Sequence, residues 1–361
     1  MQSILSQFQL EGQPLSCVRY GNGHINETYR VETNAPHAYI LQKINRRVFS
    51  NVPGLMRNIA AVTAYLRRQA DDPRRVLTLI PTVDGESYYV SPDQDCWRMY
   101  EFITDSLCLD QPESWEDLKQ SGVAFGEFQN QLADYPADTL IEVIPRFHDT
   151  PDRFRQLKEA IARDPAGRLS SCQPEIDFYL AHESEAGCLI DLLKTGKLPL
   201  RVTHNDTKLN NVMLDQFTRT PLCVIDLDTI MPGLAAHDFG DSIRFGASTA
   251  AEDEKDLDKV EMSLSLFEAY AEGFLSACGS RLTALEKETL PMGAKLMTLE
   301  CGSRFLADYL NGDVYFHTAR PEHNLDRART QMKLVRDMEN KWDAMRSIIA
   351  EKGSHFPILN S

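Results

Sequence analysis

The sequence predicts an α+β fold in which a small, β-rich N-terminal lobe precedes a larger helical lobe. Three observations support this class. Strand-like segments and turns fill most of the first hundred residues, helical periodicity dominates after about residue 105, and a β-rich stretch interrupts the helices near residues 200–230. We expect domains at residues 1–102 and 103–361, because chains of this length commonly form two domains.

The N-terminal lobe is expected to be a mostly antiparallel sheet with one helix. Short strands are predicted on either side of a glycine-rich turn in "VRYGNGHINETYRVET", and again in "HAYILQKI". The apolar residues of "GLMRNIAAVTAYLRRQ" recur at helical spacing. Further strands are predicted in "RVLTLIPTVDGESYYV" and "CWRMYEFI".

The C-terminal lobe is expected to be helical with one embedded β-hairpin. Its strands lie in "LRVTHNDTKLNNVMLD" and "TPLCVIDLDTIMP", which flank the turn "QFTRT". The acidic "AEDEKDLD" is expected to open a solvated helix, since carboxylates stabilise the N-terminal end of a helix dipole. Helical spacing is found in the segments "SWEDLKQSGVAFGEFQNQLADY", "PEIDFYLAHESEAGCLIDLLKTG", "EKDLDKVEMSLSLFEAYAEGFLSACG", "TALEKETLPMGAKLMTLECGSRFLADYLNG" and "NLDRARTQMKLVRDMENKWDAMRSIIAEKG".

The composition narrows the possible function classes. A formal net charge of −15 disfavours binding to nucleic acid or to an anionic membrane, because phosphates repel an acidic partner. The eight cysteines form no CxxC pair, which favours buried, reduced thiols over a zinc site. The N-terminus lacks a basic start, and no apolar run approaches the roughly 20 residues of a membrane span. We therefore expect a soluble, cytoplasmic protein.

The segment "HNDTKLNN", residues 204–211, carries the strongest indication of chemistry. Phosphoryl transfer to a hydroxyl group needs a carboxylate that orients the acceptor and takes its proton, and oxygen ligands that hold magnesium against the phosphates. In the protein-kinase catalytic loop a metal-binding Asn follows the base Asp at a fixed spacing. Asp206 and Asn211 have this spacing, and a strand follows at once. The alternative is that these residues only cap a turn.

A second metal-binding carboxylate is expected where the hairpin ends. Asp226 terminates the apolar run of "CVIDLD", 20 residues after Asp206, which leaves room for two short strands and a turn. Asp228 would point to the same face of an extended strand and could contact a second magnesium ion. Two carboxylates and a carboxamide supply the oxygen ligands that Mg²⁺ prefers.

The segment "HDFGD", residues 237–241, resembles the magnesium-binding signature of protein kinases. Asp238 nevertheless lies 32 residues after Asp206, beyond the hairpin and the helix-breaking "MPG". It therefore cannot occupy the end of the hairpin. We interpret the segment as structural, with Asp238 capping or tying the catalytic loop and Gly240 permitting a tight turn.

The motifs "HNDTKLNNV", "VIDLDTIMPG" and "DFGDSIRFGAS" resemble the aminoglycoside phosphotransferase and choline kinase-like superfamily, and within it the N-acetylhexosamine 1-kinases. The resemblance implies a bilobal, protein-kinase-like fold. It also implies transfer of the γ-phosphate of ATP to the anomeric 1-hydroxyl of N-acetylglucosamine or N-acetylgalactosamine, with magnesium. It extends over nearly the whole chain, through "YGNGHINETY", "YILQKIN", "LMRN", "FGEFQN", "FHDTPDRF", "CQPEIDFYLAH" and "ECGSRFLADYLNGDVYF".

Candidate nucleotide-binding residues lie mainly in the N-terminal lobe. Gly21 and Gly23 form part of a phosphate loop or of a plain hairpin turn, since a full GxGxxG pattern would need glycine at Asn26. The strand lysine that grips phosphates in kinases should lie in "AYILQKI". That position holds Gln42, with Lys43 next to it, and neighbouring strand residues face opposite sides.

Two further nucleotide contacts are expected. Backbone groups from Glu101 to Ile103, in "RMYEFI", fit the connection between lobes that pairs with the adenine edge. A central strand without ligands is the alternative there. Lys208 of the catalytic loop is a candidate for contact with the γ-phosphate, or a solvated loop lysine.

The resemblance also implies acceptor-binding residues. It favours His24 and Arg304 as sugar contacts, with a hydrogen-bonded loop histidine as the alternative for His24. Arg304 and Asp308 share a helical face, where a simple ion pair is the alternative. Phe245 and Tyr315 would present apolar faces to the sugar ring or its acetyl methyl group, or else be core aromatics.

The expected function is therefore that of a sugar 1-kinase, with ATP as co-substrate, magnesium as cofactor and Asp206 in contact with the sugar. Two alternatives stay open. One is the same fold acting on another small alcohol, such as choline, an aminoglycoside or homoserine. The other is a nucleotide-binding pseudokinase, against which the intact set of Asp206, Asn211 and Asp226 argues.

Overall fold

Backbone contacts divide the chain into two units that are not contiguous in sequence. The computed structural model describes residues 1–21 and 25–357. The first unit comprises Met1–Cys108, Asp138–Pro145 and Val212–Met231, and the second comprises Leu109–Ala137, Arg146–Asn211 and Pro232–Ser361. The first unit thus joins most of the predicted N-terminal lobe to the β-rich segment after residue 211, which the predicted boundary at 102/103 places in the other lobe.

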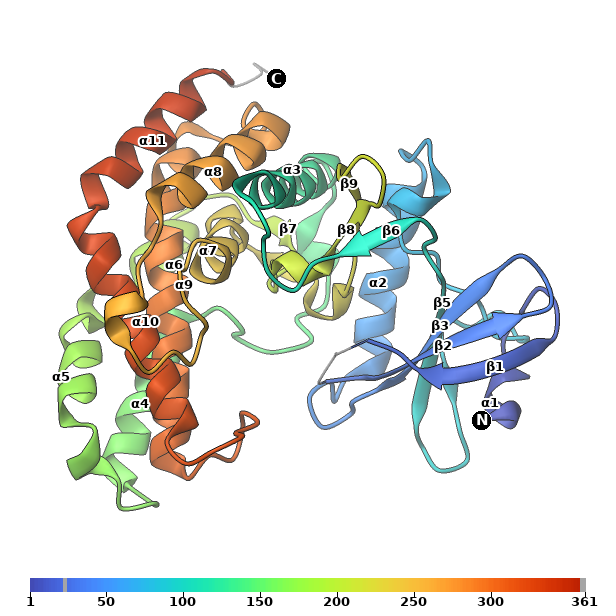
Figure 1. The fold of residues 1–361 in the computed structure, drawn as a ribbon, viewed down its shortest axis with the longest axis horizontal. Helices are drawn as coiled ribbons and strands as arrows, with labels where there is room; N and C mark the ends of the chain where they lie inside the picture. The colour runs from blue at the N-terminus through green and yellow to red at the C-terminus, as the bar shows by residue number, and fades with distance from the viewer. Residues whose placement is uncertain (22–24, 358–361) are drawn as a thin grey trace. The chain divides into compact units, whose positions relative to one another are not determined.

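The first unit is built on a five-stranded antiparallel sheet with strand order β1-β2-β3-β5-β4 (Figure 1). Leu41 lies opposite Met99, and both are fully buried together with Val31. At the next register position Gln42 lies opposite Arg98, so this pair faces the other side of the sheet. The elements are α1 (Gln2–Leu5), β1 (Pro14–Arg19), β2 (Glu27–Thr33), β3 (Ala38–Ile44), β4 (Tyr89–Val90) and β5 (Cys96–Glu101).

Helix α2 (Val52–Arg67) forms hydrogen bonds to the other two segments of the first unit, residues 138–145 and 212–231. The Asn58 amide on this helix donates to the carbonyl oxygens of Ile141, at 2.7 Å, and Ile230, at 3.1 Å. These bonds explain why residues 138–145 and 212–231 belong to the same unit as the N-terminal sheet. Asn51 begins the helix by accepting a hydrogen bond from the Gly54 N–H.

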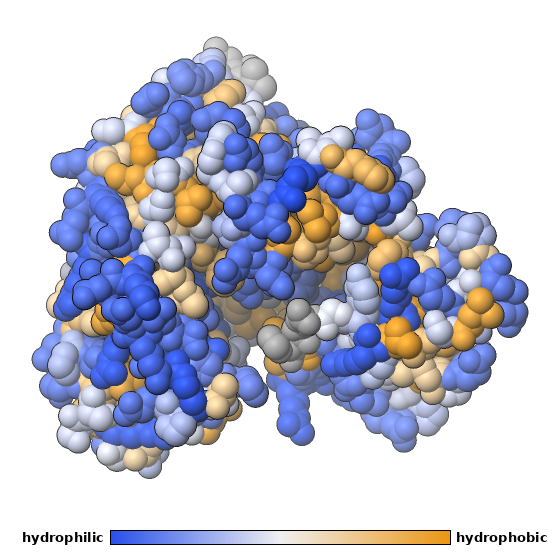
Figure 2. Space-filling view, viewed as in Figure 1, coloured by the Kyte–Doolittle hydropathy of each residue, from blue (hydrophilic) through white to orange (hydrophobic). Residues whose placement is uncertain are grey.

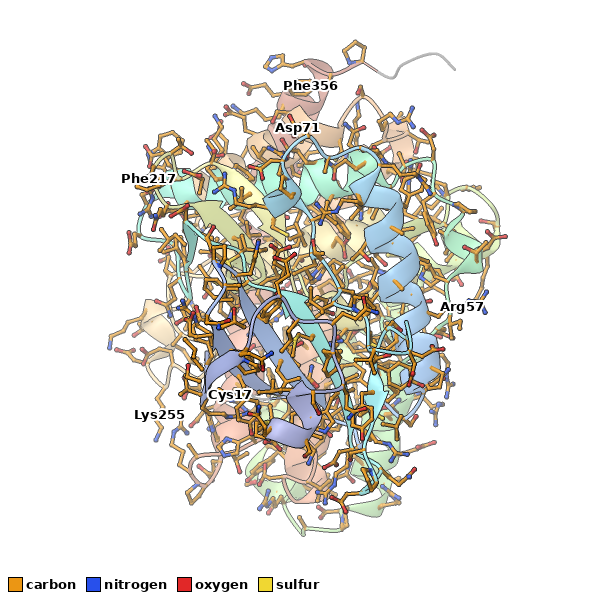
Figure 3. The ribbon with its side chains drawn as sticks, turned by 90° about the vertical axis from the view of Figure 1, so that its right-hand side faces the viewer. Cys17, Arg57, Asp71, Phe217, Lys255 and Phe356 are labelled. Carbon is orange, nitrogen blue, oxygen red and sulfur yellow. The ribbon has the colours of Figure 1, made fainter. Side chains whose placement is uncertain are left out.

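The predicted β-hairpin is confirmed in the first unit. Strands β8 (Val212–Asp215) and β9 (Pro221–Val224) pair antiparallel, and β6 (Ser106–Cys108) adds a third strand beside β8. The Asp215 carboxylate stabilises the turn by accepting hydrogen bonds from the N–H groups of Phe217 and Thr218, each at 3.0 Å. Phe217 points away from the hairpin and is 78% exposed (Figure 3).

In "RVLTLIPTVDGESYYV" the predicted turn at "VDGES" and a strand after it are present, but the regular strand predicted before the turn is wrong. Only β4 is a strand there, with an isolated bridge between Leu79 and Tyr100. The Arg67 guanidinium instead binds the carbonyl oxygens of Pro73, at 2.7 Å, and Val76, at 2.6 Å. A side chain from the end of α2 therefore satisfies backbone groups before the segment reaches β5. The Ile80 N–H and the Thr78 carbonyl then pair with Met99 and Glu101 without forming a regular strand.

The second unit is helical, and the predicted α+β class is confirmed. Helix α9 packs against α4, α7, α10 and α11, while α3 packs against α8 (Figure 1). Thr283 and Glu286 form a capping box at the start of α9. The helices are α3 (Trp115–Gln131), α4 (Thr150–Arg163), α5 (Gln173–Ala181), α6 (Cys188–Lys194), α7 (Ala235–Gly246), α8 (Leu264–Cys278), α9 (Ala284–Asn311), α10 (His323–Asn340) and α11 (Trp342–Ser354).

The helix predictions need correction in three segments. The acidic "AEDEKDLD" does not open a helix, because α8 begins only at Leu264, where Ser263 accepts a hydrogen bond from the Leu266 N–H. Before it, Asp256 caps a short 3-10 turn by accepting a hydrogen bond from the N–H of Asp258. The segments with helical spacing at residues 174–196 and 324–353 each form two helices, α5 and α6 in the first and α10 and α11 in the second.

The tight turn predicted at Gly240 is also wrong. Gly240 lies inside α7, and a Cβ atom there would be 2.3 Å from the Gly293 carbonyl oxygen of α9. A Cβ atom at Gly293 would in turn be 2.0 Å from the Ala236 carbonyl oxygen. The glycines therefore let the two helix backbones approach closely, which fixes the position of "HDFGD" relative to α9.

The surface is dominated by polar side chains where the outer helices of the second unit lie. Figure 2 shows mostly hydrophilic residues over α5 and α10, as expected for a chain with a net charge of −15. Within residues 1–21 and 25–357, no helix has the length and apolar character needed to cross a membrane.

Candidate active site

The catalytic loop predicted at residues 204–211 follows strand β7 (Arg201–Thr203) in the second unit. Asp206 Oδ1 lies 2.9 Å from the Lys208 ammonium. The Asn211 amide donates to Asp206 Oδ2 at 3.1 Å and to the Asp206 carbonyl oxygen at 2.8 Å. The structure therefore brings these three predicted site residues together. Because the Asn211 nitrogen is committed to Asp206, its oxygen Oδ1 is the atom left to bind a cation.

The neighbours of Asp206 keep it ionised. Burial raises the pKa of the Asp206 carboxyl group, but the Lys208 ammonium and the Asn211 amide outweigh this effect and hold the pKa below its ordinary value. The Asp206 carboxylate in turn raises the pKa of Lys208. At neutral pH the loop thus presents a carboxylate that can accept a hydrogen bond from a hydroxyl group.

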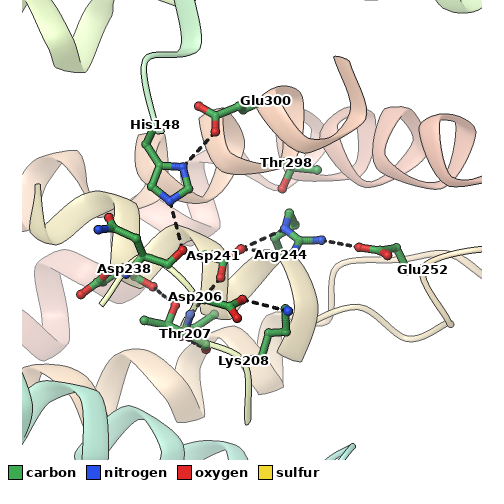
Figure 4. Close-up of polar contacts among 12 residues, drawn as sticks. His148, Asp206, Thr207, Lys208, Asp238, Asp241, Arg244, Glu252, Thr298 and Glu300 are labelled. Carbon is green, nitrogen blue, oxygen red and sulfur yellow. Dashed lines mark hydrogen bonds and ion pairs between the residues drawn. The ribbon is translucent and has the colours of Figure 1, made fainter. Parts of the chain in front are cut away.

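Asp238 holds the backbone of this loop from helix α7 (Figure 4). Its fully buried carboxylate accepts hydrogen bonds from the N–H groups of His204, at 2.9 Å, and Asn205, at 2.8 Å. It also accepts one from the Gln129 amide at 2.8 Å. Asn205 has a left-handed backbone with φ of +64°, a conformation that needs such support. The prediction that Asp238 ties the catalytic loop is confirmed.

A second set of contacts from α7 fixes the residue after Asp206. The Asp241 carboxylate accepts from the Thr207 N–H at 3.0 Å, and the Ser242 hydroxyl donates to the Thr207 carbonyl at 2.7 Å. Arg244 neutralises Asp241 at 3.1 Å. Sequence reasoning did not assign Asp241 this role. The signal was the spacing of Asp238 and Asp241, which puts both carboxylates on one face of a helix.

A buried His148–Glu300 pair also contacts the loop (Figure 4). His148 Nδ1 lies 2.9 Å from Glu300 Oε1, and Nε2 lies 3.2 Å from the Asn205 carbonyl oxygen. Burial opposes the charge of His148, but the Glu300 carboxylate outweighs it and raises the His148 pKa. Burial likewise opposes the charge of Glu300, yet the His148 imidazolium holds the Glu300 pKa at about 2. Sequence reasoning gave neither residue a role.

Arg304 lies one helical turn after Glu300 on α9, among three aromatic rings. Its guanidinium carbon is 5.7 Å from the ring centroid of Phe147, 5.8 Å from that of Tyr315 and 5.4 Å from that of Phe316. In the part of the chain that the structure describes, no hydrogen bond or ion pair engages its five N–H groups. Arg304 is therefore a half-buried cation with donors available to a ligand.

The helical ion pair considered for Arg304 and Asp308 does not form. The Asp308 carboxylate instead accepts hydrogen bonds from the N–H groups of residues 314–316, at 2.8 to 3.0 Å. Asp308 thereby fixes the segment that carries Tyr315, whose side chain is 65% exposed. Phe245, the other aromatic candidate, is half-buried on α7.

Asp226 and Asp228 belong to the first unit and have different surroundings. Asp226 is exposed and has a left-handed backbone with φ of +57°. Asp228 lies in the 3-10 turn Leu227–Thr229 and is 3% exposed, so the extended strand assumed for this pair ends earlier than predicted. Asp228 Oδ1 forms an ion pair with Arg98, and Oδ2 accepts a hydrogen bond from Asn26 at 2.5 Å.

The two candidates on β3 point in opposite directions, as expected for strand neighbours. The Gln42 amide donates to the Thr28 hydroxyl at 3.0 Å, and its oxygen accepts from Arg98 Nε at 2.9 Å. The Lys43 ammonium lies 2.7 Å from Asp95 Oδ2. Gln42 is thus on the side of Asp228, and Lys43 is on the other side. Sequence reasoning missed Arg98, because its position opposite Gln42 depends on the strand register.

The connection after β5 leaves the backbone N–H of Ile103 for a ligand. The N–H of Glu101 donates to the Thr78 carbonyl, and that of Phe102 to the Ala38 carbonyl, each at 2.9 Å. Among the described residues no partner is found for the Ile103 N–H. Gly21 has φ of +73°, which glycine adopts without strain. Gly23 and His24 lie outside the described residues.

One group of potential metal ligands occurs elsewhere in the described ranges. His182, Glu185 and Glu339 bring their ligand atoms within 4.8 Å of one another. The Lys295 ammonium binds Glu185 at 2.6 Å and Glu339 at 2.9 Å, and His182 Nε2 lies 3.0 Å from Glu339. The group is therefore explained as an ion-pair network.

Comparison with known proteins agrees with this chemistry. Residues 16–272 match the phosphotransferase enzyme family. A microcompartment-associated aminopropanol kinase superposes with a TM-score of 0.59 at 17% identity, covering 95% of this chain and 97% of that chain. An aminoglycoside phosphotransferase from Alicyclobacillus acidocaldarius gives 0.60 at 14% identity, covering 98% and 96%.

A third solved structure contains a nucleotide analogue. The amicoumacin kinase hAmiN, in complex with AMP-PNP, Ca²⁺ and Ami, has a TM-score of 0.58 at 15% identity, covering 93% of this chain and 91% of that chain. At such identities the likeness establishes the fold, and the predicted kinase-like arrangement of an antiparallel sheet and a helical part is confirmed.

Proposed function

We propose that this chain, which belongs to the phosphotransferase enzyme family, transfers the γ-phosphate of ATP to the anomeric 1-hydroxyl group of N-acetylglucosamine or N-acetylgalactosamine. The observation that carries the proposal is the ionised Asp206 held beside Lys208 and Asn211 on a braced loop. The choice of sugar rests on the motif resemblance and on the environment of Arg304.

Asp206 is proposed to orient the acceptor and take its proton. Its carboxylate would accept a hydrogen bond from the 1-hydroxyl group, which positions the oxygen in line with the γ-phosphate. A pKa below the ordinary value makes Asp206 a weak base. This suits phosphoryl transfer, because the loose transition state needs little proton removal before the phosphorus–oxygen bond forms.

The donor set fits magnesium. Asn211 offers a carboxamide oxygen whose nitrogen is already engaged, and Asp226 offers an exposed carboxylate. We propose that these two residues hold the ion, which when bound neutralises charge on the β- and γ-phosphates. Asp228 fits the same role less well, because Arg98 and Asn26 engage both of its oxygens.

The nucleotide is proposed to bind the first unit. The unpartnered Ile103 N–H suits the adenine edge, together with backbone groups of Glu101. Gly21 and Gly23 would lie near the phosphates, and Lys208 is the proposed contact for the γ-phosphate. Gln42, rather than Lys43, is on the side of Asp228, two residues after the proposed metal ligand Asp226.

A neutral acceptor is favoured by the charges around Arg304. Burial and the charge of Arg304 lower the pKa of Arg153, so two guanidinium groups lie near each other in this region. They would repel a cationic acceptor such as choline or an aminoglycoside, but can donate to hydroxyl and acetamide oxygens. Phe245 and Tyr315 are proposed apolar contacts, and His24 a further polar one.

The acceptor is tested by coupled ADP release with ATP and magnesium. We expect turnover with N-acetylglucosamine and N-acetylgalactosamine, weaker turnover with glucose and galactose, and none with choline or aminopropanol. Phosphorus NMR should show a sugar 1-phosphate. Turnover with choline or aminopropanol alone would contradict the sugar assignment and favour an amino-alcohol kinase. The absence of ADP release with every acceptor tested would favour the pseudokinase.

Asp206→Asn tests the catalytic role directly. The change preserves side-chain shape but removes the charge that accepts the hydroxyl proton, so turnover should fall at least ~10²-fold. AMP-PNP affinity, measured by calorimetry, should change little, because the adenine and the phosphates keep their other contacts. Full turnover in this variant would contradict the assignment.

A further inference from the structure

The sheet of the first unit lacks the phosphate-gripping lysine that kinases carry on the third strand. Gln42 occupies that position, and its amide is used by Thr28 and Arg98. Lys43 faces the other way, where Asp95 neutralises it. Strand β3 therefore presents no ammonium group on the side of Asp228.

A guanidinium group from the neighbouring strand occupies this space instead. Arg98 of β5 lies directly opposite Gln42 in the strand register, and its side chain is 1% exposed. Nε donates to Gln42, and a terminal nitrogen forms an ion pair with Asp228 Oδ1. A buried cation is costly without a partner, so the Arg98–Asp228 pair must persist in the folded unit.

Asn26 completes the cluster from the end of the glycine-rich turn. Its amide donates to Asp228 Oδ2 at 2.5 Å, and its oxygen accepts a hydrogen bond from the Asn45 N–H at 2.9 Å. Asn26 stands where a full GxGxxG pattern would have its last glycine. The start of β2, the end of β3, strand β5 and the 3-10 turn after Asp226 are thereby joined through one carboxylate.

We propose that Arg98 is the positioning residue for magnesium–nucleotide binding in this chain, and that Asp228 is its anchor and not a second metal ligand. Arg98 holds the Leu227–Thr229 turn through Asp228. This 3-10 turn fixes the backbone of Asp226 in its left-handed conformation. Asp226 precedes Asp228 by two residues and is the proposed metal ligand. The proposal rests on the proposed function, since it concerns the same metal–nucleotide site.

The burial of Arg98 distinguishes positioning from direct contact. A side chain that is 1% exposed cannot reach a phosphate without leaving Asp228 and Gln42. Its effect must therefore pass through the orientation of Asp226, as outer partners orient the ligands of other metal sites. Loss of Arg98 should weaken binding of the metal–nucleotide complex and leave binding of the metal-free nucleotide unchanged.

Calorimetry with AMP-PNP on the full chain measures this difference, because it needs no acceptor. For Arg98→Gln we expect affinity in the presence of magnesium to fall by about 10- to 100-fold, the usual effect of removing an outer partner of a metal ligand. Affinity in the presence of EDTA should stay within about twofold of the wild-type value. Arg19→Gln is the matched control, since it removes one cation from the exposed part of the same sheet.

The second variant moves the charge back to β3. In Gln42→Lys/Arg98→Gln, the new ammonium starts from the residue whose oxygen already lies 2.9 Å from Arg98 Nε. It can therefore approach Asp228 from the opposite strand. We expect this double variant to recover most of the lost magnesium-dependent affinity. It also keeps the proposal testable if Arg98→Gln, which leaves Asp228 buried and unpaired, fails to fold.

The calorimetric results distinguish the role of Arg98 from the proposed function. Unchanged magnesium-dependent affinity in Arg98→Gln, or an equal loss with EDTA, would overturn the positioning role. A folded double variant without recovery would overturn it too. If the wild type bound no magnesium–AMP-PNP at all, the proposed function would fail, and the role of Arg98 would fail with it. If the wild type bound the nucleotide but phosphorylated no sugar, only the acceptor assignment would fail.

Discussion

At the scale of single residues, the signature that most resembles a kinase metal site performs another task. Both oxygens of Asp238 accept hydrogen bonds from donors of the protein, two of them backbone N–H groups of the catalytic loop. The sequence predicted this from position alone, because the hairpin separates Asp238 from Asp206. Position along the chain did not reveal the ion pair of Asp228 with Arg98, which lies 130 residues away.

Asp238→Asn should damage the loop without changing the metal requirement. An amide nitrogen would replace one acceptor oxygen and face an N–H group, which leaves a buried donor unsatisfied at a cost of about 1–3 kcal/mol. We expect a lower thermal midpoint and a turnover number at least ~10-fold lower, because Asp206 loses its fixed position. The magnesium concentration that gives half-maximal turnover should be unchanged.

The control for this change is Asp258→Asn, which neutralises an exposed carboxylate. It should alter neither the thermal midpoint nor turnover. A large increase in the magnesium requirement of Asp238→Asn would show that Asp238 is a metal ligand after all.

At the scale of elements, helices with regularly spaced apolar residues were predictable from the sequence. Segments whose backbone is held by hydrogen bonds from side chains were not. The patterns of "GLMRNIAAVTAYLRRQ" and "TALEKETLPMGAKLMTLECGSRFLADYLNG" predicted α2 and α9, because one apolar face and clear caps decide a helix locally. The acidic stretch before α8 and the segment before β4 were mispredicted. Their backbones are held by turn caps and by Arg67, which local propensity does not reveal.

Gly240→Ala should push α7 away from α9, although the catalytic loop is held by side chains of α7. The added methyl group would meet the Gly293 carbonyl oxygen at 2.3 Å, and backbone cannot move aside as a side chain can. Although alanine favours a helix by about 1 kcal/mol over glycine, we expect a net loss of about 1–3 kcal/mol in the free energy of unfolding. Urea denaturation measures it.

Gly353→Ala, also inside a helix, is the matched control. Its new methyl group would lie 3.4 Å from Lys287 Cδ, the flexible part of a side chain. This variant should be as stable as the wild type or slightly more stable. Equal stabilities for the two alanine variants would show that the α7–α9 approach is not tight.

At the scale of the whole molecule, the candidate residues are divided between the two units. Asp206 and Asn211 belong to the second unit, whereas Asp226, Asp228 and Arg98 belong to the first. The three proposed reactive residues were chosen from the sequence alone, because their spacing along the chain is set by a short hairpin. It could not predict the supporting residues. His148 and Glu300 are 152 residues apart, and only the packing of α9 beside the loop brings them together.

The His148–Glu300 pair makes the stability of the protein depend on pH. The pKa of His148 is raised in the folded protein, so its charge adds to the free energy of unfolding. This addition is complete below the ordinary pKa of about 6.5 and is lost as the pH rises through the pKa of the folded state. The pKa of Glu300 is about 2, so its charge stabilises the folded protein at every pH above the ordinary pKa of a glutamate. This stabilisation is lost only as the pH falls towards 2. His148→Gln should therefore lower the urea midpoint more at pH 6 than at pH 9. His355→Gln, at an exposed position, should show no such difference. An equal loss at both pH values would mean that the imidazole acts only as a neutral hydrogen-bond donor to the Asn205 carbonyl.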